Sequence, residues 1–253
     1  MLLEFEAQTP SRAPRPELAA LNATRGLGWY VPLRAAADFL LSAVMLVVSA
    51  PVILLAAALV RLTSRGPAFF TQVRLGQGGR PYRIYKIRSM YHDCERVSGP
   101  RWSFGRDTRI TPVGRVLRLT HVDELPQLWN VLRGEMSLIG PRPERPEFVP
   151  ELARALPGYW QRLTVRPGVT GLAQVQLPPD ADLTSVRRKL AHDLYYIQQL
   201  SPWLDLRLLA CTAFYALGIP FALLSRFLGI PGGEEVEQAM HAFLGEPPAR
   251  LSA

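Results

Sequence analysis

Two adjacent carboxylates, Asp123 and Glu124, are the residues of this sequence best suited to do chemistry. An ionised carboxylate can attack an electrophile or bind magnesium. A diphosphate group brought to such a pair needs its negative charge neutralised by cations. The arginines that surround the pair in the sequence are Arg115, Arg118, Arg133, Arg142 and Arg145. Carboxylates and arginines at this spacing indicate a phosphoryl-transfer site.

The acidic pair also has a simpler explanation, which is helix capping. Aspartate is a favoured N-cap, and acidic residues in a first turn complement the helix dipole. One face of a helix that starts near Asp123 and stops at Gly134 is predicted by the spacing of Leu125, Leu128, Trp129 and Leu132. The arginines favour the chemical explanation, because Arg142 stands between two prolines that hold its backbone in place.

A long apolar segment precedes this region. Residues 39–60 carry no charge, and as a helix they would span roughly 33 Å, close to the thickness of a bilayer core. Pro51 interrupts the middle, and the basic residues Arg34, Arg61 and Arg65 flank both ends. Basic flanks favour the cytoplasmic side. Two topologies therefore remain open: a spanning helix with a proline kink, and a re-entrant helix–break–helix hairpin.

The remainder of the chain predicts an α+β fold that is mostly helical with a short β-hairpin. The hairpin strands are expected at 68–73 and 81–86, on either side of a glycine-rich turn. Thr111 is expected to cap a short helix, and further helices are expected over 147–156 and 183–200. Residues 203–230 are apolar again, with interruptions, and indicate an interfacial or core-packing pair of helices.

These elements divide the chain into five parts. The predicted parts are a flexible N-terminal arm (1–30), a membrane helix (31–65), a catalytic domain (66–205), apolar membrane-associated C-terminal helices (206–232) and a tail (233–253).

The composition narrows the possible partners. The net charge is +8, and almost all of the basic residues are arginines, since Lys86 and Lys189 are the only lysines. The planar guanidinium suits phosphate oxygens, so nucleic acid, anionic lipid or a phosphorylated small molecule could each be a partner, although codon bias alone would also give this composition. The two cysteines, Cys94 and Cys211, argue against a disulfide framework or a cysteine zinc site.

Five ordered motifs resemble the bacterial sugar transferases, the monotopic polyprenyl-phosphate phosphoglycosyl transferases. They are GPAFFTQVRLG (66–76), YKIRSM (85–90), VDELPQLWNVLRG (122–134), MSLIGPRP (136–143) and RPGVTGLAQV (166–175). The resemblance covers roughly residues 32–218.

This resemblance implies a re-entrant membrane helix broken at Ser49 and Pro51, with the catalytic domain on the cytosolic face of the inner (cytoplasmic) membrane. It implies transfer of a sugar-1-phosphate from a nucleotide sugar, with a UDP-sugar as the expected donor, to polyprenyl (undecaprenyl) phosphate, a step that initiates glycan or exopolysaccharide assembly. Asp123 would form a covalent phosphosugar-aspartyl intermediate. Asp123 and Glu124 would be the metal ligands, with Mg²⁺ as the cofactor.

Phosphate and nucleotide contacts are expected from Lys86, Arg88, Arg133, Arg142 and Pro143. Two features depart from the family's pattern. Residues 176–178 read Gln-Leu-Pro where the family usually has Asn-Gly-Arg, which leaves the donor open, and the apolar C-terminal region extends past Ile219.

Two other functions are compatible with parts of the sequence. One is a catalytically degenerate membrane scaffold or regulator of a polysaccharide assembly complex, which the intact carboxylate pair disfavours. The other is a basic nucleic-acid binder, which the uncharged segment 39–60 disfavours because such a segment belongs in lipid. The sequence does not indicate an oligomeric state.

Overall fold

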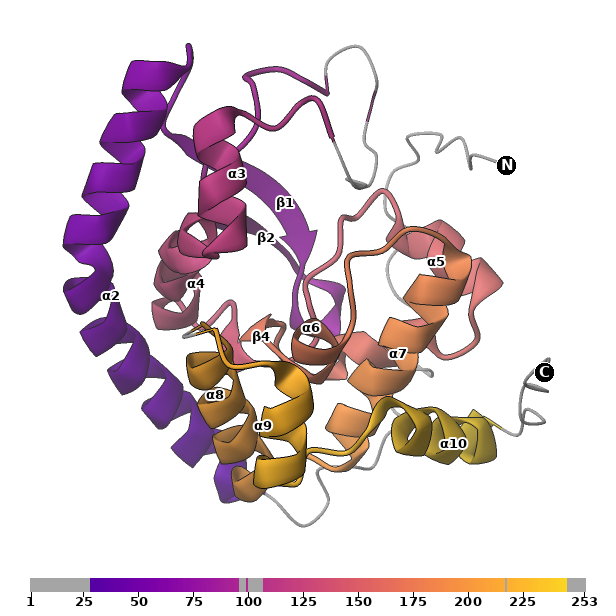
Figure 1. Ribbon diagram of the computed structural model, residues 1–253. Coiled ribbons are helices and arrows are strands. Elements are labelled where there is room, and N and C mark those ends of the chain that lie inside the picture. Colours follow the sequence, from indigo (N-terminus) through magenta and orange to yellow (C-terminus); the bar gives the residue numbers. More distant parts are fainter. Residues whose placement is uncertain (1–27, 96–98, 100–106, 217, 245–253) are drawn as a thin grey trace.

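A computed structural model describes residues 28–95, 99, 107–216 and 218–244 of the 253-residue chain. One long helix, α2 (Tyr30–Thr63), curves along one side of a body built from the rest of the chain (Figure 1). The predicted N-terminal arm lies outside the described residues up to residue 27.

Helix α2 has two unlike faces. The side chains that it buries against the body lie on one helical face near each end; they are Tyr30, Asp38, Ser42, Ile53, Ala56, Ala57 and Val60. Within the described residues, α2 is the one helix long and apolar enough to cross a membrane. Only 22% of its most apolar 18-residue stretch is buried in the protein. A core helix of a soluble protein would be mostly buried. The exposed apolar face of α2 therefore needs another apolar environment.

The expected helix–break–helix hairpin is not confirmed. Helix α2 continues through Ser49 and Pro51, and the Ser49 hydroxyl donates to the carbonyl of Leu46 at 3.4 Å. A proline removes one backbone donor and bends a helix without having to end it. The polypeptide accordingly curves around the body instead of dividing into two helices (Figure 1).

The predicted β-hairpin is confirmed. Strand β1 (Phe69–Leu75) pairs antiparallel with β2 (Pro81–Ile87), and Phe69 lies opposite Ile87. The connecting turn η2 (Gln77–Gly79) requires glycine, because Gly78 has a φ of 67°.

The segment that carries the acidic pair differs from expectation. Thr111 caps α3 (Pro112–Leu119) as predicted, with its hydroxyl accepting from the amide of Gly114. The next element, however, is the 3₁₀ helix η3 (Val122–Gln127), followed by the short α4 (Leu128–Leu132).

The prediction that Asp123 is an N-cap is therefore wrong. His121, with a left-handed φ of 55°, holds the cap position, and Asp123 lies in the first turn. Trp129 is exposed rather than buried, because the 3₁₀ turns rotate the helix face away from the predicted one.

A short parallel pair joins two of the motifs. Strand β3 (Ser137–Ile139) pairs with β4 (Gly168–Thr170), so the segment before Arg142 lies beside the PGVTG block. The backbones approach closely here. A Cβ on Gly168 would lie 2.1 Å from the amide nitrogen of Gly140, so both glycines permit the contact.

Helices form the rest of the body. They are α5 (Val149–Ala155), η4 (Tyr159–Thr164), α6 (Leu172–Gln176), α7 (Leu183–Gln198), α8 (Pro202–Ala216), α9 (Phe221–Leu228) and α10 (Gly233–Leu244). The helices predicted over 147–156 and 183–200 and the C-terminal helix pair are confirmed as α5, α7, α8 and α9. The prediction that residue 233 onward is a tail is wrong as far as Leu244, because Val236 and Met240, one turn apart, are buried in the core.

Candidate active site

Asp123 is a buried carboxylate that has no bonded partner among the described residues. It is 6% exposed, and it forms no hydrogen bond or salt bridge to any residue in the described part of the chain. Burial, followed by the neighbouring charge of Glu124, raises its pKa to about 6. Asp123 is still ionised above about pH 6, and a carboxylate poorly compensated by its surroundings is a reactive one.

Glu124, by contrast, is held from two sides. Lys86 Nζ lies 2.7 Å from its Oε1, and Arg142 Nη2 lies 2.7 Å from the same oxygen. Burial alone would raise the pKa of Glu124, but the charges of Arg142 and Lys86 outweigh it and hold the pKa well below its ordinary value. Glu124 is thus a fixed negative charge that positions two cations beside Asp123.

The two cations come from separate parts of the fold. Lys86 lies on β2, and burial lowers the pKa of its ammonium group. Arg142 lies on the proline-flanked segment after β3, with 44% of its side chain exposed. A guanidinium has five donors, so Arg142 retains donors for a ligand approaching from solvent while it remains bonded to Glu124.

A buried arginine, Arg162, supports the backbone at Arg142. Arg162, on η4, donates to the carbonyl oxygen of Arg142 at 2.9 Å and to the hydroxyl of Tyr159 at 2.6 Å. Its guanidinium also pairs with the carboxylate of Asp193, on α7, at 2.7 Å. On the other side, Arg74 donates to the carbonyl of Pro143 at 3.1 Å. Long-range contacts therefore fix the segment on both sides of Arg142.

Helix α2 is connected to the same segment. Arg34 donates to the Ser137 hydroxyl at 2.7 Å and to the carbonyl of Ile139. The carboxylate of Asp38 accepts from the Ser137 hydroxyl at 2.7 Å and from the amide of Leu138 at 3.2 Å. The start of the apolar helix is thus bonded to β3, which leads directly into Arg142.

Comparison with known proteins identifies the group to which the sequence belongs. The model of the family described as "Bacterial sugar transferase" matches residues 29–218, which is most of the chain. The chain belongs to this family.

Individual relatives support the assignment. A UDP-N-acetylgalactosamine-undecaprenyl-phosphate N-acetylgalactosaminephosphotransferase of Aeromonas hydrophila is 44% identical over 176 residues, 70% of this chain and 41% of the relative. A UDP-glucose:undecaprenyl-phosphate glucose-1-phosphate transferase of Caulobacter vibrioides is 44% identical over 179 residues, 69% of this chain and 66% of the relative. An exopolysaccharide production protein of Rhizobium leguminosarum is 41% identical over 189 residues, 70% of this chain and 91% of the relative. The match thus spans less than half of the Aeromonas relative.

Asp123 and Glu124 form the carboxylate dyad of this sugar transferase family member. Not every predicted phosphate ligand lies beside this dyad. The guanidinium of Arg88 is buried and donates to the carbonyls of Ser64 and Arg65 at 3.0 and 2.5 Å, at the end of α2. Arg133 is exposed and bonded to Glu135 at 3.1 Å. Of the predicted ligands, Lys86 and Arg142 lie beside the dyad, and Pro143 follows Arg142 in the chain. Roles for Arg88 and Arg133 in phosphate binding stay predictions.

One neighbour of the dyad was named only within the arginine cluster. Arg118, on α3, donates from Nε to the Ser89 hydroxyl at 2.9 Å, and its positive charge acts to lower the pKa of Asp123. The only signal in the sequence was its place five residues before Asp123. Sequence distance alone did not separate Arg118 from Arg145, which instead pairs with Glu95 at 3.0 Å.

The residue set limits how a metal ion could be held. Among the described residues there is no group of three histidine, cysteine, aspartate or glutamate side chains placed to hold one. Magnesium commonly binds one or two carboxylates together with substrate phosphates. Asp123 has free oxygens, and Glu124 is already shared by two cations. The dyad therefore fits Mg²⁺ that is held jointly with a diphosphate.

Where this member departs from the family's pattern, it contacts its own C-terminal extension. Gln176, the first of the three departing residues, donates from Nε2 to the carbonyl of Pro231 at 3.0 Å. Pro231 lies beyond the end of the family match, between α9 and α10. The unusual segment and the extension are thus packed together.

Proposed function

We propose that this protein transfers a sugar-1-phosphate from a UDP-sugar to undecaprenyl phosphate, through a covalent intermediate on Asp123. The observation that supports this proposal best is the contrast within the dyad. Within the part of the chain that the structure describes, Asp123 is buried and unpaired, and Glu124 beside it is bonded to Lys86 and Arg142. This arrangement leaves one carboxylate free to react and places two positive charges where a diphosphate would lie.

In the first step, a carboxylate oxygen of Asp123 attacks the β-phosphorus of the UDP-sugar. The bond between the β-phosphorus and the bridging oxygen breaks, and UMP leaves with that oxygen. Lys86 and Arg142 stabilise the charge that develops on the transferring and leaving phosphates. The product is a mixed carboxylic–phosphoric anhydride, in which a carboxylate oxygen of Asp123 is bonded to the phosphorus of the sugar phosphate.

In the second step, an oxygen of undecaprenyl phosphate attacks the same phosphorus. The bond between phosphorus and the Asp123 oxygen breaks, which releases undecaprenyl diphosphate sugar and regenerates the carboxylate. Asp123 and Glu124 would hold Mg²⁺ together with the diphosphate, and the ion would neutralise part of the phosphate charge. The acceptor reaches the site from the bilayer, since α2 is bonded to the segment that carries Arg142.

The same contacts support a one-sided membrane topology. The first turns of α2 are bonded to β3 and α8, and its last turns pack on Ile87 and Leu117 of the body. A helix whose two ends touch one polar body cannot place those ends on opposite sides of a bilayer without taking the body with it. We therefore propose that α2 enters the inner membrane from the cytosolic face and returns to it, with Ser49 and Pro51 at its bend.

Release of UMP tests the reaction class. The full-length protein in detergent is incubated with undecaprenyl phosphate, Mg²⁺ and either UDP-glucose or UDP-N-acetylgalactosamine, the donor types in the names of the relatives. We expect UMP from at least one donor, and none from the Asp123→Asn variant.

The covalent step needs its own readout. With a donor labelled in the β-phosphate and no lipid acceptor, label should remain on the denatured wild-type protein and be chased off by undecaprenyl phosphate. An Asp123→Asn variant that still forms UMP, or a wild type that forms UMP only when the acceptor is present and never carries label, would contradict the two-step mechanism.

A further inference from the structure

Helix α9 lies beyond the family match and presents an unusual surface. Only Leu224 of its eight residues is buried. Leu223 and Phe227, one turn apart, are 64% and 88% exposed, and Arg226 is exposed beside them. An exposed apolar pair on a short helix is unfavourable in water, because its apolar surface stays hydrated. Such a surface indicates that something covers it.

Helix α8 extends this apolar surface. Trp203 is 60% exposed, and the other large apolar side chains exposed on α8 are Leu206, Phe214 and Tyr215. A groove of about 470 Å³ between the two helices is lined by Trp203, Leu206, Arg207, Ala210, Arg226 and Phe227, with Leu228 and Gly229. The outer face of α8 and α9 is therefore one continuous surface of aromatic and aliphatic side chains, with two arginines in it.

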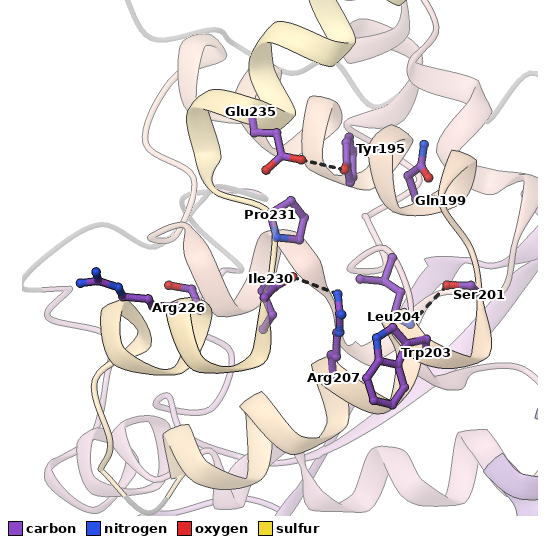
Figure 2. Close-up of a pocket in the computed structure, with 12 residues that line it drawn as sticks. Tyr195, Gln199, Ser201, Trp203, Leu204, Arg207, Arg226, Ile230, Pro231 and Glu235 are labelled. Atoms are coloured by element: carbon purple, nitrogen blue, oxygen red, sulfur yellow. Dashed lines mark hydrogen bonds between the residues drawn. The ribbon is translucent and has the colours of Figure 1, made fainter.

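The arginines are placed at the edge of the apolar surface. The guanidinium of Arg207 lies 5.0 Å from the centre of the Trp203 ring and donates to the carbonyl of Gly229 at 3.0 Å. Its Nε is buried and has no partner among the described residues, whereas the side chain as a whole lines the groove. Figure 2 shows Arg207 beside Trp203, and Arg226 extending away from the neighbouring pocket. Both cations can therefore reach a ligand that covers the groove.

The charge of this region is one-sided. From Pro202 to Gly233 the sequence has a single acidic residue, Asp205, which is buried and bonded to the hydroxyl groups of Tyr30 and Tyr196. Glu235, just after this stretch, lines the adjoining pocket together with Arg207 and Arg226, whereas no acidic side chain among the described residues lines the groove. A groove of apolar side chains, tryptophan and arginine matches the headgroup region of an anionic bilayer.

The surface is also continuous with the membrane helix. Asp205, on α8, pairs with Arg34 of α2 at 3.0 Å, so α8 is fixed to the first turns of α2. Its neighbour Leu206 and, at the start of α2, Trp29 and Leu33 are exposed. Figure 1 shows α8 and α9 beside that end of α2. A bilayer that receives the exposed face of α2 would meet α8 and α9 at its surface.

We propose that α9 and the outer face of α8 form a second membrane contact, which lies in the headgroup region and binds the phosphates of anionic phospholipids through Arg226 and Arg207. This inference rests on the proposed membrane location of α2. The occupant is the bilayer itself and not the undecaprenyl phosphate substrate, because the surface is separate from the dyad segment and open along two helices.

Spin-label accessibility in nanodiscs tests the contact. Single labels are placed by Phe227→Cys on α9, by Leu54→Cys on the exposed face of α2, and by Arg154→Cys on α5 as an exposed control, all in a Cys94→Ser background with the buried Cys211 retained. We expect the label at 227 to collide several-fold more with oxygen, relative to a water-soluble nickel complex, than the label at 154. The label at 54 should lie deeper than both.

Lipid charge tests the role of the arginine. Replacing phosphatidylcholine by phosphatidylglycerol should draw the label at 227 deeper, and Arg226→Gln should remove this dependence, whereas Arg154→Gln should not. A label at 227 that is as water-accessible as the one at 154, while 54 is deep, would overturn the inference and leave the topology of α2 intact. A label at 227 shielded from both reagents would overturn it in favour of a protein partner or a second copy. An exposed label at 54 would overturn both proposals, and UMP release would still report the reaction separately.

Discussion

Asp123 and Asp193 are two buried aspartates of this protein with a raised pKa. They differ in the residues to which they are bonded. Burial raises the pKa of each to about 6. Asp193 pairs with Arg162 at 2.7 Å, and burial of Arg162 is accompanied by bonds to Tyr159 and to the carbonyl of Arg142. Asp123 has no bonded partner among the described residues.

The difference separates a structural carboxylate from a reactive one. The Asp193 ion pair lies behind the site and holds the backbone that presents Arg142. At Asp123, the cations that could have paired with it are bonded to Glu124 instead. A perturbed pKa alone would have marked both residues as candidates for catalysis. The contacts decide between them, and the two residues should respond differently to the same kind of substitution.

The largest expected effect is on activity at Asp123. Asp123→Asn removes the nucleophile, and UMP release should fall by about 10⁴-fold or more, with the fold retained. Circular dichroism and gel filtration of the same preparation check the fold. Asp93→Asn, the same change at an aspartate whose side chain is 62% exposed, is the matched control and should keep nearly full activity. Similar losses in the two variants would remove the special status of Asp123.

The next largest effect is on stability behind the site. Arg162→Met leaves the Asp193 carboxylate buried without its cation, and this should lower the free energy of unfolding by about 3–5 kcal/mol. Thermal or denaturant unfolding in detergent measures the loss. Arg154→Met, on the exposed side of α5, should change stability little. An Arg162→Met variant as stable as wild type would show that Asp193 is not held by this pair.

How far these residues could be found from sequence depends on the range of their contacts. Asp123, Glu124, the hairpin and the Thr111 cap follow from local spacing and motif resemblance. The support of Arg142 by Arg162 could not be predicted, because it joins η4 to a segment twenty residues away through a backbone carbonyl.

Two other differences have equally physical reasons. Arg88 follows Lys86 by two residues, directly after the end of β2, yet its guanidinium binds the end of α2, because that helix end leaves carbonyls without intrahelical partners. The break expected at Pro51 is absent from α2 because one missing donor does not end a helix whose two end regions both pack on the body.

A smaller effect is expected on stability at Asp123 itself. Its folded pKa of about 6 lies above the ordinary value of about 3.9, so stability is greatest below pH 4 for this group and is lost as pH rises through 6. Asparagine cannot ionise, so Asp123→Asn should be more stable than wild type by about 1–3 kcal/mol near pH 7.5 and equal to it near pH 4. Denaturant unfolding at both pH values measures the difference. A destabilised Asp123→Asn variant would place Asp123 with Asp193 as a structural residue.

The smallest effect expected is a shift in the pH profile of the first step. Because Asp123 must be ionised to attack, single-turnover UMP release should decline below about pH 6. Glu124→Gln removes the like charge next to Asp123 and leaves Lys86 and Arg142 without their carboxylate, so the positive charge acts on Asp123 alone. The acid limb should therefore move to lower pH by about one unit, even though the maximal rate falls. Arg142→Gln should move the limb in the opposite direction, since it removes a cation that lowers the pKa of Asp123. If neither substitution moves the limb, the group that titrates near pH 6 is not Asp123, and the contrast between the two aspartates would have to rest on their contacts alone.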